Sequence, residues 1–430
     1  MTDFTTPFQR MGRLFRTMGR YALHALVCVL FVSVISDGSS GVAQAAQGNQ
    51  GLQGGWAVDD AGNVLFDKSV VDTLPFMQEA GAGWVRINFR LGDCFQDWET
   101  SVCMGRTALE AYDAVITEAQ NRNLKVLGLL SNESWHGQQS DWTANAAETT
   151  AGGSGDNAYI RDFAEKAARV LAAHFGERVP HWEVWNEPNA WTSLDANGEP
   201  TGGTFIYPSN FAWLLKRSYD AIKSADPNAA VISGGLFGHD IGGASVTIME
   251  RGQPRQAIKR GDFAPARVPG RPPSGDTSPC PSTLTNGGDY LCATYDAGIA
   301  KAKWQKGRYP LDHIGQHLYV DQGGATSAAK LSSYLDDLRN AYLKYEGKRT
   351  TKQTHLTEFG WQTPTGGLSE ATQAANLQVA YDTFKKTTYV ARAYWFAIQD
   401  VPAALLYFGL LRDDGSQKPA FATYQTAAAY

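Results

Sequence analysis

Residues 181–187 read HWEVWNE, a short and almost uninterrupted run of apolar and aromatic residues that ends in a glutamate. Such near-continuous hydrophobicity is typical of strands that are covered on both faces, as in a parallel sheet. Seven similar runs follow residue 50: GGWAV (54–58), WVRINFR (84–90), LKVLGLLS (124–131), AAVISGGL (229–236), HIGQHLY (313–319), THLTEFGW (354–361) and RAYWFAI (392–398). The pattern predicts eight buried strands.

Amphipathic segments separate these runs. One helix is expected to begin at Thr107, where Glu110 completes a capping box, and another to run from Ser209 to just before Asp226 and Pro227. Further helices are expected near 157–174, 327–345 and 369–386. Strands that alternate with helices predict an α/β fold, a single (β/α)8 TIM barrel over residues 46–430. A doubly wound open sheet is the alternative, but its usual G-x-G-x-x-G turn is missing from GWAVDDAGNV after the first strand.

A long loop rich in Gly, Pro and Arg interrupts this rhythm at residues 238–289. Loops of this length inside a compact domain are usually functional or disordered. Because it follows the fifth predicted strand, it would lie over the C-terminal face of the barrel, where active sites are built. We predict a lid or cleft wall, with a flexible insertion as the alternative.

The N-terminal 45 residues have a different character. The apolar run YALHALVCVLFVSVIS (21–36) is followed by an A-x-A site ending at Ala45, and it is preceded by basic residues: Arg10, Arg13, Arg16 and Arg20. These are the features of a secretory signal peptide, and the run is shorter than the roughly 20 residues of a spanning helix. We predict that residues 1–45 direct the protein out of the cytoplasm, to the medium or the cell envelope. An uncleaved anchor is the alternative; after cleavage no stable membrane partner is expected.

Cysteine usage agrees with export. Of five cysteines, Cys28 lies in the predicted signal peptide, which leaves Cys94, Cys103, Cys280 and Cys292. Four cysteines allow three pairings, of which the short spacings favour Cys94–Cys103 and Cys280–Cys292 in an oxidising compartment. Zinc binding is the competing use, but neither pair has C-x-x-C spacing or neighbouring histidines, so no metal is predicted.

The overall charge narrows the possible partners. A formal net charge of −5 and the lack of a basic block in the body of the chain argue against a nucleic-acid partner. The sequence contains no recognisable nucleotide loop, and we predict no cofactor.

Two predicted strands end in a glutamate, Glu187 in WNEPN and Glu358 in LTEFGW. Both would lie on the same rim of a barrel, and two facing carboxylates are the minimum equipment for glycoside hydrolysis. One must carry a proton for the leaving oxygen and the other must be ionised, so their surroundings must differ. We expect Trp185 and Trp191 to exclude water from Glu187. Arg86 and Tyr319 are expected to keep Glu358 charged.

With their flanking residues, these motifs resemble the clan A glycoside hydrolases, which are retaining (β/α)8 enzymes. In that clan the acid/base follows strand four in an Asn-Glu-Pro motif and the nucleophile lies on strand seven. WEVWNEPN (182–189) and TEFGW (357–361) are most similar to family 39, with the cellulase-like family 5 as the close alternative. The resemblance extends over nearly all of residues 46–430, apart from the loop at 238–289. It implies double displacement, with Glu358 as nucleophile and Glu187 as acid/base.

The resemblance also implies four helper residues: Arg86, His317, Tyr319 and Trp395, of which the tryptophan would floor the sugar site. Further candidates for sugar contact come from the strand ends themselves: Asn186, Trp135, His136, Trp191 and Trp361. Aromatic rings stack on sugar faces but also fill barrel rims. Each helper therefore has a structural alternative, such as a buried ion pair, a core histidine or a ring that plugs the barrel.

The sequence thus predicts a secreted retaining glycosidase that cleaves β-linked glycans and whose partner is an oligo- or polysaccharide. A transglycosylase on the same scaffold and a non-catalytic glycan-binding barrel are the alternatives. The second is disfavoured because both glutamates are present in their full context.

Overall fold

The computed structural model describes residues 48–430 apart from 57–69, 145–154, 195–199 and 238–286. The chain divides into two units, Met1–Gln44 and Ala45–Tyr430. The first unit, with the predicted signal peptide, lies outside the described residues. So does the predicted lid, except that residues 287–289, expected in the loop, instead begin helix α7 (Gly287–Ala300).

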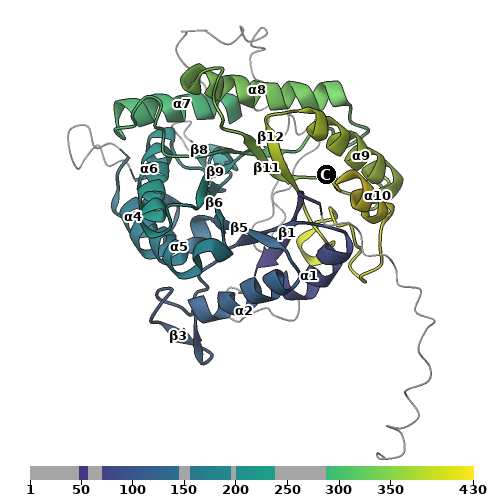
Figure 1. Cartoon of the computed structure of the whole chain (residues 1–430), viewed down its shortest axis with the longest axis horizontal. Helices are drawn as coiled ribbons and strands as arrows, with labels where there is room; N and C mark the ends of the chain where they lie inside the picture. The colour runs from purple at the N-terminus through teal and green to yellow at the C-terminus, as the bar shows by residue number, and fades with distance from the viewer. Residues whose placement is uncertain (1–47, 57–69, 145–154, 195–199, 238–286) are drawn as a thin grey trace, which may run out of the picture. The chain divides into compact units, whose positions relative to one another are not determined.

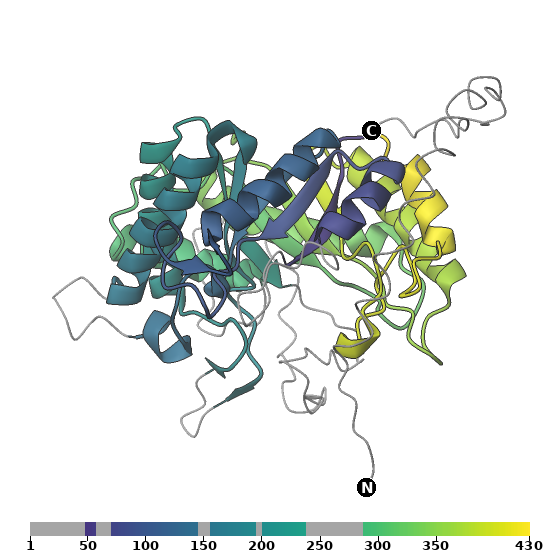
Figure 2. The ribbon, with the colours of Figure 1, turned by 90° about the horizontal axis from the view of Figure 1, so that it is seen from below.

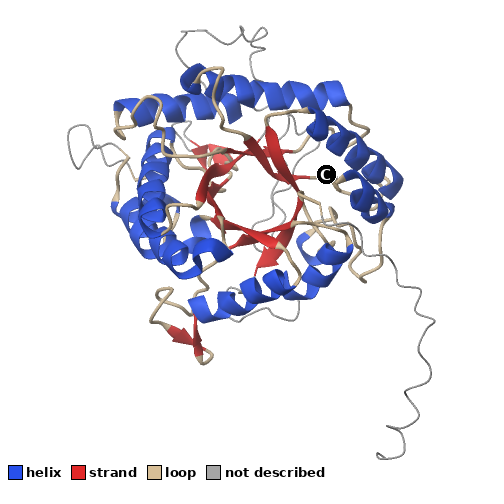
Figure 3. Cartoon of the chain, in the orientation of Figure 1, coloured by secondary structure: helices blue, strands red, loops and turns tan. Residues whose placement is uncertain are grey.

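The second unit is built around a closed barrel of eight parallel strands, shown as the central ring in Figure 3. Around the barrel the strand order is β1-β12-β11-β10-β9-β6-β5-β2. Their bounds are Gly51–Trp56 (β1), Trp84–Asn88 (β2), Lys125–Leu130 (β5), His181–Asn186 (β6), Ala230–Phe237 (β9), Ile314–Leu318 (β10), Thr354–Phe359 (β11) and Val390–Trp395 (β12). All eight predicted runs form strands, so the (β/α)8 fold is confirmed. The first strand begins at Gly51, before the predicted run at 54–58.

Helices connect successive strands and surround them (Figures 1 and 2). Besides α7 they are α1 (Val70–Glu79), α2 (Ala108–Asn121), α4 (Ala158–Asp162) continued by η5 (Phe163–Ala168) and α5 (Arg169–Phe175), α6 (Pro208–Ala225), α8 (Ala328–Glu346), α9 (Glu370–Lys386) and α10 (Pro419–Ala427). The predicted capping box is confirmed, because Thr107 and Glu110 exchange both of its hydrogen bonds. Among the described residues, no helix is long and apolar enough to cross a membrane.

A disulfide pins the connection between β2 and α2. Cys94 and Cys103 are bonded, with Cα atoms 6.0 Å apart. The bond attaches the start of this connection to β3 (Val102–Cys103), which forms a small antiparallel hairpin with β4 (Arg106–Thr107). One predicted pair is therefore confirmed. Cys280 lies outside the described residues, and its pairing with Cys292 stays a prediction.

The barrel interior is apolar in the middle and polar at both ends. Trp84, Leu127, Ile232 and Tyr394 come from four different strands (β2, β5, β9 and β12) and form one buried cluster. Below it, at the N-terminal ends of the strands, three histidine rings lie together: His181, His313 and His355, with ring centroids 4.8 to 6.5 Å apart. Arg392 lies over the Trp84 ring beside them, 3.8 Å from its centroid.

This histidine cluster should make the protein acid-labile. Burial, and then the charge of Arg392, lowers the pKa of His181 to about 3; burial also lowers the pKa of His313 and of His355. Below pH about 6.5 these histidines bind protons in the unfolded chain but stay neutral in the folded protein. The free energy of unfolding therefore falls as the pH falls. We expect a loss of about 1.4 kcal/mol per pH unit for each histidine that stays neutral.

Urea unfolding between pH 7 and pH 5 measures this slope. Carboxylates contribute to it as well, so the comparison is with His355→Gln, which removes one titrating group from the cluster. The slope of the variant should be shallower by about 1.4 kcal/mol per pH unit. Equal slopes in the two proteins would show that His355 gains a proton in the folded state.

Candidate active site

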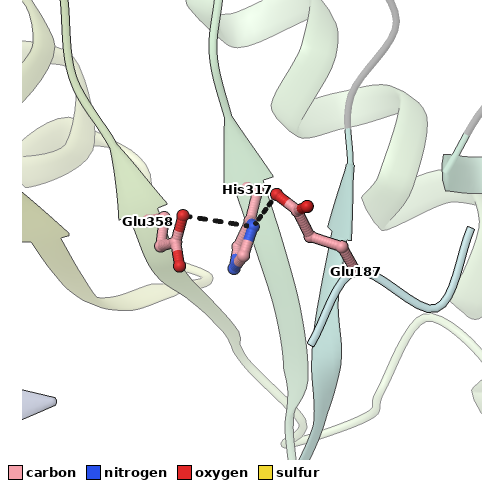
Figure 4. A group of neighbouring side chains, drawn as sticks. All are labelled: Glu187, His317 and Glu358. Carbon is pink, nitrogen blue, oxygen red and sulfur yellow. Dashed lines mark hydrogen bonds and ion pairs between the residues drawn. The ribbon is translucent and has the colours of Figure 1, made fainter. Parts of the chain in front are cut away.

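The carboxylates of Glu187 and Glu358 lie on either side of His317 at the C-terminal ends of the strands (Figure 4). Glu187 follows β6, His317 is in β10 and Glu358 is in β11. One carboxylate oxygen of each glutamate and one ring nitrogen of His317 all lie within 4.8 Å of one another. Two glutamates from distant parts of the chain therefore share one small site, as the sequence predicts.

The backbone at the end of β6 is held in an uncommon conformation that aims Glu187. Trp185 and Glu187 both have positive φ, 78° and 46°, in the left-handed region that costs non-glycine residues free energy. The Trp185 ring packs away from the barrel axis against three aromatic side chains: Trp142, Tyr159 and Phe163. Trp191 is half-buried against Phe205. The carboxylate of Glu187 is bonded instead by His317 Nδ1 at 2.8 Å. A histidine, rather than Trp185, is therefore the bonded neighbour of this carboxylate.

Glu358 is aimed into the site by an irregularity in β11. Gln316 pairs with Leu356 but His317 pairs with Glu358, so Thr357 is an extra residue in the ladder. Such a bulge re-aims the side chains that follow it. As a result the consecutive side chains of Thr357 and Glu358 both reach polar partners inside the barrel, on Glu183 and Arg86.

Strong donors hold Glu358 in its ionised form. Arg86 Nη1 donates to its Oε1 at 2.6 Å, and the Tyr319 hydroxyl donates to its Oε2 at 2.8 Å. Burial alone would raise the pKa of Glu358, but the charges of His317 and Arg86 and these two hydrogen bonds outweigh burial and lower it. Burial, followed by the charges of the carboxylates, raises the pKa of Tyr319 well above its usual value, so it stays a donor. The predicted roles of Arg86 and Tyr319 beside Glu358 agree with this geometry.

His317 is fully buried beneath the two carboxylates. Burial would lower its pKa, but the charge of Glu358, with the hydrogen bond and charge of Glu187, outweighs burial and raises it. Its Nδ1 lies 3.6 Å from Glu358 as well as 2.8 Å from Glu187, so one imidazole can share a proton with either side. Arg86 is buried too, at 1% exposure. Both residues therefore bond to protein groups around the two carboxylates.

One residue of this network escaped the sequence analysis. Glu183, two positions along β6 from His181, is fully buried, and its Oε2 accepts from Arg86 Nε at 2.6 Å. Asn186, predicted as a helper, accepts from Arg86 Nη2 at 3.0 Å through its side-chain oxygen. A glutamate inside an otherwise apolar strand is a signal that could have found Glu183, because a buried carboxylate requires a partner.

Two tryptophans predicted to contact sugar, one just after β11 and one at the end of β12, pack into the outer core of the barrel. Trp395 and Trp361 are fully buried and pack with Phe359 on the outer side of the strands. The next residue, Phe396, is half-buried and lies beside Tyr319, with ring centroids 6.4 Å apart. Because side chains alternate along a strand, a one-residue difference moves a ring from the site to the outer core.

Trp135 and His136 lie on a separate pocket of about 330 Å³. Trp135 is half-buried and His136 is exposed, and Asp141, Tyr159 and Asp162 complete much of the lining. An aromatic ring beside carboxylates is a common setting for sugar hydroxyls. The structure thus keeps these two residues as candidates for an outlying sugar contact, away from the carboxylate pair.

Glu187, His317 and Glu358 are close enough together to bind a metal ion, and they are the group of this kind in the described part of the chain. However, the atoms that could bind a metal ion already form hydrogen bonds within the protein. Glu358 accepts from Arg86 and Tyr319, and His317 bonds to Glu187. The set therefore suits proton sharing between carboxylates better than it suits a cation.

Comparisons with known proteins give one family model and a set of similar solved structures. Residues 303–424 match the family model described as "Glycosyl hydrolase catalytic core". No curated protein matches the sequence. In structure the chain is similar to a family 39 glycoside hydrolase from the gut symbiont Bacteroides cellulosilyticus WH2, with 18% identity and a TM-score of 0.50. The match covers 83% of this chain and 60% of that one, so the chain spans less than two thirds of this relative's length.

Two other solved structures are similar at the same level. A family 5, subfamily 18 protein from Streptomyces cattleya in complex with GlcNAc has 15% identity and a TM-score of 0.54, with 88% of this chain and 80% of that chain covered. An exo-β-1,4-mannosidase from Opitutaceae bacterium strain TAV5 has 16% identity and a TM-score of 0.51, with 92% and 62% covered. At such identities the similarity establishes the fold alone.

Two findings bear on the class of protein. The chain forms a (β/α)8 barrel, and its residues 303–424 match a glycosyl hydrolase catalytic core. The matched core and the neighbours in families 39 and 5 are in line with the predicted resemblance to clan A, and the neighbours share its fold.

Proposed function

We propose that this protein is a retaining glycoside hydrolase that cleaves β-linked glycans outside the cytoplasm. The observation that carries the proposal is the short separation of two carboxylates with different partners. Oxygens of Glu187 and Glu358 lie within 4.8 Å of each other. In retaining enzymes the two carboxyl groups are about 5–5.5 Å apart, whereas inverting enzymes need more room for a water.

The different partners of the two carboxylates support different roles. Glu358 is charged and accepts on both oxygens, which suits a nucleophile that attacks the anomeric carbon. Glu187 is bonded on Oε1 by His317, while its Oε2 has no hydrogen-bond partner in the described part of the chain. That oxygen is free to face the glycosidic oxygen of a substrate.

Cleavage would then proceed in two steps. Glu358 attacks the anomeric carbon as the glycosidic bond breaks, and Glu187 gives a proton to the leaving oxygen. Glu187, now ionised, takes a proton from a water that attacks the same carbon and releases Glu358. Two inversions at one carbon retain its configuration. His317 holds a proton beside both carboxylates, and its charge reduces the repulsion between them during this exchange.

The cellular location is part of the proposal. The Cys94–Cys103 disulfide supports an oxidising compartment, and the basic and apolar segment before residue 46 supports export. The β-linkage rests on the resemblance of the strand-end motifs to clan A.

The test is the stereochemistry of the first product. The protein from residue 46 is incubated with a panel of aryl β-glycosides and β-linked polysaccharides, including β-mannosides, and the released sugar is followed by proton NMR before it mutarotates. A β-anomer that appears first supports retention. An α-anomer would refute double displacement, and product longer than the substrate would favour transglycosylation. No turnover or glycan binding by folded protein would reject the proposed function.

A further inference from the structure

Glu183 is a charged group for which the proposed reaction has no direct use. It lies in the middle of β6 with no exposed surface, and it does not touch Glu187 or Glu358 in any hydrogen bond of the described residues. Its Oε1 accepts from the Gly235 backbone N–H at 2.9 Å and from the Thr357 hydroxyl at 2.8 Å. Its Oε2 accepts from Arg86 Nε at 2.6 Å. A carboxylate so fully bonded is held in one position.

Arg86 connects Glu183 to the reacting group. Its guanidinium uses Nε for Glu183 and Nη1 for Glu358, both at 2.6 Å, and Nη1 also donates to Gln53 at 2.7 Å. A guanidinium is planar, so fixing Nε and Nη1 fixes the direction from which its charge reaches each partner. Glu183 therefore determines where Arg86 can lie relative to Glu358.

The charge balance adds a second effect. If Arg86 had only Glu358 as its counter-charge, one cation would neutralise one nucleophile in a buried place, where Coulomb attraction is strong. A carboxylate held that tightly resists bond formation at the anomeric carbon. With Glu183 present, Arg86 divides its attraction between two carboxylates. The three groups Glu183, Arg86 and Glu358 together keep a net negative charge beneath the sugar, where the transition state becomes positive.

We propose that Glu183 is a positioning residue of this glycosidase, which fixes Arg86 and takes up part of its charge so that Glu358 remains reactive. The inference rests on the proposed function. The structural alternative is that Glu183 only pairs a buried arginine for the stability of the barrel.

The first test is Glu183→Gln, which keeps the shape of the side chain and removes its charge. With Arg86 no longer shared, Glu358 becomes less basic. Both limbs of the pH profile of kcat/KM should therefore move to lower pH, the acid limb by about one unit, and kcat should fall about 10- to 100-fold. The matched control is Glu346→Gln, which breaks a largely buried ion pair with Lys352 (2.8 Å) at the end of α8. The control should lose stability and leave the profile in place.

A second variant covers the case in which Glu183→Gln does not fold. Glu183→Asp keeps the charge, but its shorter side chain cannot reach Arg86 and its backbone donor together. It should lower kcat while its acid limb stays at the wild-type pH. Loss of rate by the same factor at every pH in Glu183→Gln, or an acid limb that moves in Glu183→Asp, would overturn the proposal.

A readout without turnover separates this inference from the proposed function. Protein labelled with ¹³C at the glutamate carboxyls is titrated by NMR, and the Glu358 signal is identified by its loss in Glu358→Gln. The midpoint of Glu358 should be lower in Glu183→Gln than in wild type. A lowered midpoint in a protein that cleaves no glycoside would uphold the coupling and reject the function. An unchanged midpoint in a protein that does cleave glycosides would reject the coupling and uphold the function.

Discussion

Replacing Glu358 with glycine should reduce the hydrolysis of an aryl β-glycoside by about 10⁴-fold or more, the range found when a covalent nucleophile is removed. The carboxylate is the group that would form the covalent bond, and its two described partners cannot take its place, because Arg86 and Tyr319 are hydrogen-bond donors. The two donors would remain around an empty space of about the size of a small anion. Circular dichroism and thermal unfolding would check that the variant is folded.

Azide should restore turnover in this variant with a defined stereochemistry. The anion can occupy the space of the missing carboxylate between Arg86 and Tyr319 and attack the anomeric carbon from that side, which gives an α-glycosyl azide from a β-glycoside. The product is identified by proton NMR. A β-glycosyl azide from Glu358→Gly would contradict the assignment of the nucleophile.

Glu187→Gly is the matched variant from the other side of the site. An activated aryl group leaves without acid help, so the glycosyl-enzyme still forms but water attacks it slowly. Azide then attacks the intermediate from the Glu187 side and should give the β-glycosyl azide. Opposite anomers from the two variants are therefore expected. The same anomer from both would show that the two carboxylates do not face one anomeric carbon from opposite sides.

The second large effect is expected from a single methyl group. In Gly235→Ala the new Cβ would lie 2.1 Å from His317 Cδ2, 2.2 Å from its Nε2 and 2.6 Å from Thr357 Oγ1. His317 is fully buried and cannot swing into solvent, so the imidazole must shift or tilt from its place between the carboxylates that it joins. We expect activity to fall about 100-fold, and the free energy of unfolding to fall by about 1–3 kcal/mol, as for other overpacked cores.

The control for this substitution is Gly323→Ala. A Cβ at Gly323, in the loop after β10, would have no atom within 4 Å, so its effect on stability should stay within about 0.5 kcal/mol. Urea unfolding and steady-state kinetics on both variants decide the matter. If Gly235→Ala kept the wild-type kcat/KM, the position of His317 between the glutamates would not matter for the reaction.

Local patterns were sufficient for most of the fold and for the reacting pair. The apolar runs predict the eight strands because a strand buried on both faces must be apolar almost throughout, and the capping box at Thr107 predicts the start of α2 because its hydrogen bonds lie within one turn. Glu187 and Glu358 were found in the same way. Each follows or ends a strand, and the ends of parallel strands meet at one rim whatever their separation along the chain.

The orientation of individual side chains was not available from such patterns. Strict alternation along β11 would place Thr357 and Glu358 on opposite faces, and only the bulge seen in the pairing with β10 turns both inward. The same limit led to the prediction of Trp395 beside the carboxylates, where the structure has Phe396 next to Tyr319. A register is set by hydrogen bonds between strands that are distant in sequence, and one residue of shift exchanges the two faces.

The sequence by itself thus determined the barrel, the disulfide at Cys94 and Cys103, and the two glutamates, because each depends on residue types and spacings within short segments. Only the tertiary structure decided what surrounds those glutamates. The buried chain from Glu183 through Arg86 to Glu358, and the imidazole of His317 between the carboxylates, join four strands of the barrel. Electrostatic coupling depends on distances of a few ångströms and on burial, which exist only once the strands have closed into a ring.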